Sequence, residues 1–121
     1  MPTASGHTSA ISARKVIDTD VFDTTGNKIG EVKDVVLEKT TSNIMFAVVG
    51  FGGLLGMGER FHPVPWNELD YDENRNGYVV SFTKEQLKAA PTGSIDELVR
   101  NDGQRYRDRA FEYYKTRPYW S

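Results

Sequence analysis

A glycine-rich stretch that ends in two prolines and a tryptophan, residues 51–66 (FGGLLGMGERFHPVPW), constrains this chain more than any other feature. It follows a continuous apolar run, residues 44–49, that is short, β-branched and aromatic, as in a strand buried on both faces. Glycine tolerates positive φ and close backbone approach, so the stretch predicts a tight, specially shaped connection. Pro63 and Pro65 remove two backbone donors, which predicts a sheet edge or a strand end, and Trp66 is expected to close a core.

Strand and turn signals precede this stretch. We expect one strand over residues 16–22 and a second over residues 28–39, joined by a hairpin turn at residues 23–27. The alternation of the second strand changes phase near Asp34, which predicts a β-bulge of the kind that helps a small sheet to curl closed. We interpret Asp34 as part of this bulge rather than as a functional carboxylate, because the sequence shows no partner for it.

A hairpin and short helices follow. Asn76-Gly77 predicts a β-hairpin with a type I′ turn, which requires positive φ at both residues. Two capping boxes, which begin at Thr83 and Ser94, open short helices, and residues 104–114 predict a third helix. This succession predicts a mainly β chain, a small antiparallel β-barrel with a short α-helical C-terminal extension.

The composition divides the chain into three parts. Residues 1–15 are rich in Ser, Thr, Ala and Gly, and we expect a flexible N-terminal segment there. Residues 16–91 carry the strand signals and form the expected barrel domain, which Pro91-Thr92-Gly93 brings to an end. Residues 92–121 form the expected helical and aromatic extension.

The glycine-rich stretch also resembles a known family. Its pattern, FGG-x-LG-x-G followed by PVPW, resembles the signature of PRC-barrel domains, and residues 28–32 and 83–87 agree with that family. The resemblance covers about residues 17–91, and its signature residues are Phe51, Gly52, Gly53, Gly56, Gly58, Pro63, Pro65 and Trp66. It implies the small β-barrel of the photosynthetic reaction-centre H subunit and of a ribosome-maturation factor. The family implies roles in assembly and interaction, and the tail resembles those of some bacterial members.

Patterns for catalysis are weak. The glycines do not follow the order of a P-loop or a dinucleotide fingerprint. His62 has no nucleophile that the sequence can place beside it, so we interpret it as a hydrogen-bonded structural residue rather than a general base. The acidic and amide residues at 70–76 lack the ligand series of an EF-hand, and the chain contains no cysteine. We expect no catalytic residue, metal site or cofactor, and a small-ligand site near His62 is one alternative.

Charge is distributed unevenly along the chain. Residues 1–99 carry 9 Lys/Arg and 14 Asp/Glu, whereas residues 100–121 carry 6 Lys/Arg and 3 Asp/Glu. A basic, aromatic tail beside an acidic body predicts that the tail contacts something, either its own barrel or a second molecule. The candidate interface residues are Tyr106, Phe111, Tyr113, Tyr114, Tyr119 and Trp120. Because pairing adds to a small core and these residue types are common at interfaces, we expect a homodimer and a non-enzymatic interaction or assembly role.

The same tail motivates a second alternative, an RNA- or ribosome-associated factor. Arginines contact phosphates and aromatic rings stack on bases, and the candidate contacts are Arg105, Arg107, Arg109 and Arg117. Acidic residues within the tail reduce its net positive charge, so nucleic-acid binding is the alternative and not the main hypothesis. The sequence shows neither an apolar run of membrane-spanning length nor a signal-peptide pattern, so we expect a cytoplasmic protein without membrane insertion.

Overall fold

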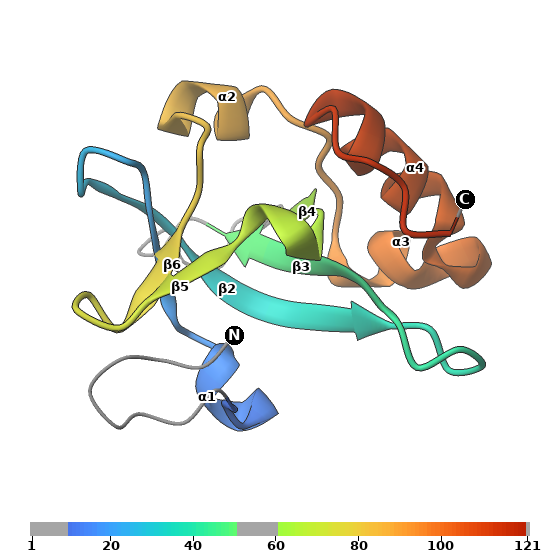
Figure 1. Cartoon of the computed structure of the whole chain (residues 1–121). Helices are drawn as coiled ribbons and strands as arrows, with labels where there is room; N and C mark the ends of the chain where they lie inside the picture. Colours follow the sequence, from blue (N-terminus) through green and yellow to red (C-terminus); the bar gives the residue numbers. More distant parts are fainter. Residues whose placement is uncertain (1–9, 51–60, 121) are drawn as a thin grey trace.

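The computed structural model describes residues 10–50 and 61–120 (Figure 1). Its strands are β1 (Asp20–Phe22), β2 (Lys28–Leu37), β3 (Ile44–Gly50), β4 (His62–Val64), β5 (Asp70–Asp72) and β6 (Gly77–Val79). Its helices are α1 (Ala13–Val16), η2 (Trp66–Glu68), α2 (Lys84–Lys88), α3 (Ile95–Val99), η3 (Arg100–Gly103) and α4 (Gln104–Tyr113). The strands form one six-stranded sheet in the order β4-β3-β2-β1-β6-β5.

The sheet is mixed rather than antiparallel throughout, and within the described residues hydrogen bonds do not close it into a barrel. β6 runs parallel to β1, with Val21 opposite Tyr78 and Phe22 opposite Val79, whereas the other neighbouring strands are antiparallel. β4 and β5 lie at the two edges, and no ladder of hydrogen bonds joins them in the part of the chain that is described. The β5–β6 hairpin lies beside β1, although it is far from β1 in the sequence. In this order of strands the edge strands β4 and β5 do not pair with each other. The mainly β class is confirmed.

The sheet nevertheless curls around a core. Its register shifts between Val32 and Asp34 in β2, so the expected bulge near Asp34 is confirmed. There the Asp34 carboxylate accepts a hydrogen bond from the backbone N–H of Val35 at 2.8 Å. The bend brings β6 over the inner face, where Tyr78 shares one buried cluster with Val32 and Val49.

The first strand is shorter than the sequence predicts. Ser12 caps the short helix α1, and Val16 lies in that helix with only 5% of its surface exposed. Asp18 has φ 71°, and the chain enters β1 only at Asp20. The turn that follows is the expected one, because Asp23 accepts hydrogen bonds from the backbone N–H groups of Thr25 and Asn27.

β3 is buried on both faces, as its continuous apolar run predicts. On one face Ala47 and Val49 join the core of the curled sheet. On the other face Phe46 and Val48 pack against Leu98 of α3. The second cluster is therefore shared between the sheet and the C-terminal extension, whose helices lie beside β3 and β4 in Figure 1.

Both predicted capping boxes are present and explain where two helices begin. Thr83 and Gln86 exchange side chain–backbone hydrogen bonds at the start of α2, and Ser94 and Glu97 do so at the start of α3. These caps satisfy backbone donors that the first helical turn leaves open. None of the helices in residues 10–50 and 61–120 combines the length and the apolar character needed to cross a membrane.

Candidate interaction site

Residues 116–120, which we call the hook, fold back along α4 (Figure 1). α4 ends in a Schellman motif, in which the N–H of Thr116 donates to the carbonyl of Phe111 at 2.9 Å and that of Lys115 to Glu112 at 3.2 Å. Lys115 occupies the left-handed position of this motif, with φ 55°, where glycine is the usual residue. The motif reverses the direction of the chain, so the hook turns back towards the rest of the protein.

Arg107 is the centre of the surface that receives the hook. Its side chain is 8% exposed, and its Nη1 lies 3.2 Å from Glu38 Oε2 while its Nη2 lies 3.1 Å from Asp108 Oδ1. The Trp120 ring covers the guanidinium, with 3.7 Å between the Arg107 Cζ and the ring centre. A buried cation needs such compensation, and the two carboxylates and the aromatic face supply it.

Glu38 links the hook to the body. It follows β2, and its Oε2 accepts a hydrogen bond from the Tyr119 hydroxyl at 3.0 Å in addition to the one from Arg107. Hydrogen bonds from Thr41 above all, and also those from Tyr119 and Asn43 and the charge of Arg107, hold the Glu38 pKa below its usual value. Glu38 is therefore a charged acceptor at neutral pH, which strengthens its bond to the hook.

Aromatic rings complete the contact. The buried Phe111 ring lies 5.7 Å from the Tyr119 ring and 4.8 Å from the Trp120 ring, both edge to face. At the start of the hook, the Thr116 hydroxyl donates to Glu68 Oε2 at 2.8 Å. We call Glu38, Glu68, Arg107 and Phe111 the seat, because each of them contacts the hook.

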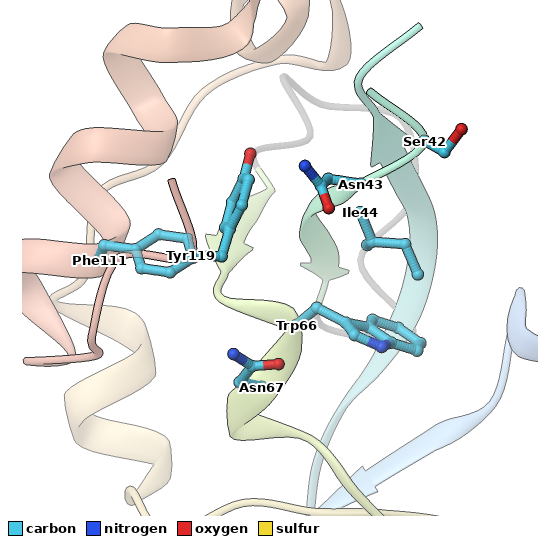
Figure 2. A pocket seen from close by; sticks show the side chains of 7 residues that line it. All are labelled: Ser42, Asn43, Ile44, Trp66, Asn67, Phe111 and Tyr119. Carbon is cyan, nitrogen blue, oxygen red and sulfur yellow. The ribbon is translucent and has the colours of Figure 1, made fainter. Parts of the chain in front are cut away.

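A pocket of about 250 Å³ lies between the hook and the sheet. Figure 2 shows Tyr119 and Phe111 on one side of it and Ile44 and Trp66 on the other. The remaining lining residues are Ser42, Asn43 and Asn67. Aromatic and aliphatic walls with an amide rim suit an apolar or aromatic side chain of a binding partner.

Exposed apolar side chains flank this pocket. Leu37, which pairs with Ile44 across the β2–β3 ladder, is 61% exposed, and Trp120 is 40% exposed. The surface is continuous, because Ile44 and Tyr119 line the same pocket and Tyr119 contacts Trp120 at 4.9 Å between ring centres. We call Leu37, Ile44, Trp66, Tyr119 and Trp120 the apolar surface.

The six predicted interface aromatics do not form one cluster. Only Phe111, Tyr119 and Trp120 come together at the seat. Tyr106 is half-buried in the cluster with Phe46 and Leu98, whereas Tyr113 donates to the carbonyl of Gln86 at 2.6 Å. Tyr114 packs on Phe82 with 4.6 Å between ring centres and lines a second pocket of about 380 Å³.

The four candidate RNA contacts also separate. Arg105, Arg109 and Arg117 are exposed, whereas Arg107 lies beneath Trp120. Of the aromatic side chains interleaved with them, Tyr119 and Trp120 already pack on the seat. The arrangement thus leaves three of the four candidate arginines available to solvent and removes Arg107.

The predicted signature residues fall partly outside the described chain. Phe51, Gly52, Gly53, Gly56 and Gly58 belong to residues 51–60, which the structure does not describe. Pro63 and Pro65 are fully buried, and Pro63 lies in β4 at the sheet edge, where the missing donor costs no ladder bond. Trp66 packs edge to face on Tyr78 at 5.7 Å.

His62 lies in a structural environment. It is 5% exposed, and its Nδ1 lies 3.2 Å from the carbonyl oxygen of Pro91. It lines neither of the two pockets described above. Within residues 10–50 and 61–120, no group of three or more His, Cys, Asp or Glu side chains is arranged to hold a metal ion.

Sequence reasoning missed Glu38, Leu37 and Ile44 as parts of the site. Glu38 and Tyr119 are 81 positions apart, and no local pattern marks Glu38 as a partner of the tail. The only available signal was the contrast between an acidic body and a basic tail, which predicts contact without naming a residue.

Comparison with known families agrees with the fold. The family model of the PRC-barrel domain matches residues 9–87, which include all six strands and the start of α2. No curated protein matches the chain at a significant level. The match ends before α3, α4 and the hook, so the site described above lies largely in the extension. With more than half of its length matched by this model, the chain belongs to the PRC-barrel domain family.

Proposed function

We propose that this protein is a non-enzymatic interaction module that pairs with a second copy of itself through the apolar surface. The observation that carries the proposal is the exposure of Leu37 (61%) and Trp120 (40%), which adjoin Ile44 and Tyr119 in the lining of an aromatic-walled pocket. Exposed apolar side chains that form a continuous surface around a pocket are typical of protein interaction sites. Fully burying a leucine contributes about 1.5–3 kcal/mol, and because Leu37 is 61% exposed each copy would gain about 1–2 kcal/mol of this on pairing.

The chemistry of the surface supports binding rather than catalysis. Its pocket is lined by amide, hydroxyl, aliphatic and aromatic groups, with no carboxylate, imidazole or amine among the lining residues. Acid–base or nucleophilic catalysis needs such titratable groups within hydrogen-bonding distance of one another. PRC-barrel membership adds a family known for interaction and assembly, although fold alone does not assign a function.

The oligomeric state of the full-length chain tests the proposal. Size-exclusion chromatography with light scattering should give twice the chain mass, and Leu37→Ser and Trp120→Ser should each shift the protein to the monomer. Tyr71→Ser is the matched control: Tyr71 is 44% exposed on the edge strand β5 and lies outside the apolar surface, so this variant should remain a dimer. Circular dichroism checks that every variant stays folded.

Two results would overturn the proposal. A monomeric wild-type chain at high concentration would exclude self-pairing. Co-eluting nucleic acid, detected by absorbance and removed by salt, together with loss of that binding in Arg105→Ala/Arg109→Ala, would replace it with the RNA-associated alternative.

A further inference from the structure

We infer that the two copies exchange their hooks, so that residues 116–120 of each chain bind the seat of the partner chain. This inference rests on the proposed pairing and specifies how the pair is held together. The structure shows the hook on its own seat, which establishes what the seat accepts: a short segment ending in Tyr-Trp. A second copy carries the same segment and the same seat.

The contacts between hook and seat can be transferred from one chain to another. The side-chain contacts include Thr116 on Glu68, Tyr119 on Glu38, Arg107 and Phe111, and Trp120 on Arg107 and Phe111. None of these contacts depends on which chain supplies the hook. Exchange therefore preserves every one of them while joining two chains, which is why domain swapping is a low-cost route to dimers.

The hinge favours exchange. Only Lys115 separates α4 and its cap from the hook, and the folded-back arrangement holds this residue at φ 55°. A non-glycine residue in the left-handed region is strained, because its Cβ crowds the backbone. An extended Lys115 would release that strain, give up the two backbone hydrogen bonds of the Schellman motif and carry the hook away from its own seat. Short hinges under strain are the kind that promote swapping.

Charge and exposed surface point to a second copy as the occupant. Lys115 and Arg117 give the hook region positive charge, whereas the seat includes the carboxylates of Glu38 and Glu68. The seat also adjoins Leu37 and the pocket, because Glu38 follows Leu37 directly and Tyr119 lines that pocket. Hooks that cross between chains would bring the two copies of this surface together and cover them.

Complementation between two defective chains tests the exchange. One chain carries Tyr119→Ser/Trp120→Ser and keeps an intact seat; the other carries Glu38→Ala/Arg107→Met and keeps an intact hook. Each alone should be monomeric, whereas their mixture should contain a heterodimer, detected by native mass spectrometry, because one chain supplies the hook and the other the seat. If the wild type is dimeric but the mixture stays monomeric, pairing stands and exchange is excluded.

Variants of the hinge give a second, independent test that leaves the seat intact. Lys115→Gly removes the strain of the folded-back hook at both hinges of a dimer, so the dimer dissociation constant should rise by about 25-fold, from about fivefold per hinge. Lys115→Ile, with a β-branched side chain that tolerates positive φ poorly, should lower it. The matched control is Asn76→Gly, at φ 51° on the β5–β6 hairpin, which should leave the constant unchanged.

The sign of the hinge effect separates the two proposals. If the hook stays on its own chain within the dimer, Lys115→Gly stabilises the paired form or leaves pairing unchanged, and the exchange is excluded. If the wild-type chain is monomeric at every concentration tested, both the pairing and the exchange are excluded.

Discussion

Among the glycines of residues 10–50 and 61–120, Gly77 leaves the least space for a side chain. It pairs with Asp72 as the first residue of β6, so the hairpin loop is four residues long and only Asn76 has a positive φ. The expected type I′ turn is therefore wrong, although the hairpin is confirmed. A Cβ at Gly77 would lie 2.7 Å from the Asp20 carbonyl oxygen and 2.7 Å from Phe22 Cε2. Glycine is required there for close packing of β6 on β1.

Gly77→Ala should lower the free energy of unfolding by about 1–3 kcal/mol, because the backbone at Asp20 and the half-buried ring of Phe22 must move to admit the methyl group. Urea denaturation of the variant measures this. Asn76→Gly is the matched neighbour: it relieves a positive φ and should leave stability unchanged or raise it by up to about 1 kcal/mol. Equal stability of Gly77→Ala and the wild type would contradict the steric argument.

Glu31 gives the protein a pH-dependent contribution to stability. Its carboxylate lies 2.8 Å from Lys28 Nζ and 2.7 Å from Lys33 Nζ, and these bonds lower its pKa from 4.5 to about 2. A carboxyl group with a lowered pKa in the folded state stabilises the protein above pH 4.5, and this contribution disappears as the pH falls towards 2. The charged form of the Glu31 carboxyl group therefore stabilises the folded state.

Glu31→Gln should remove this dependence. Between pH 4.5 and 2, the wild type should lose about 1 kcal/mol more stability than the variant, a small effect because the three side chains are partly exposed. Urea titrations at several pH values measure the difference. Parallel curves for the variant and the wild type would refute the role of Glu31.

At the scale of elements, α3 joins the extension to the sheet. Leu98 is fully buried against Phe46 and Val48 of β3, whereas its neighbour Val99 is 46% exposed. The helix has only five residues, so its packed face rather than its intrinsic propensity holds it in place. The sheet face of β3 would lose its cover without this helix.

Leu98→Ala should cost about 2–5 kcal/mol of stability, the usual range for a buried leucine. Val99→Ala, one position away on the exposed side, should cost well under 1 kcal/mol. Thermal and urea unfolding of both variants provide the comparison. A small effect of Leu98→Ala would mean that the extension does not share a cooperative core with the sheet.

The elements themselves were largely predictable. The buried strand β3, the hairpins and both capping boxes follow from patterns within a few residues, and the structure contains them. The first strand was predicted too long, because Ser12 offers a helix cap that the alternation of residues 16–22 does not reveal. Local sequence signals predict most elements correctly. Where a helix-cap signal and a strand signal overlap, as they do at the start of this chain, they favour different structures.

At the scale of the whole molecule, the arrangement of the sheet depends on contacts that are distant in sequence. β1 pairs with β6, more than 50 positions away, and this pairing is parallel. Turn and strand signals predict antiparallel neighbours, since they describe hairpins between consecutive strands. The open sheet with a separate extension leaves the apolar surface and the seat between two parts of the chain that no local pattern connects.

The sequence by itself determined the mainly β class, the family, the bulge in β2 and the basic aromatic tail, because each depends on residue types at short spacing. Tertiary structure decided that β6 pairs in parallel with β1, that Arg107 is buried beneath Trp120, and that Glu38 receives the hook. Burial and ion pairing are properties of surfaces brought together by folding. The residues around Arg107 in the sequence do not indicate whether its guanidinium is covered by Trp120 or by water.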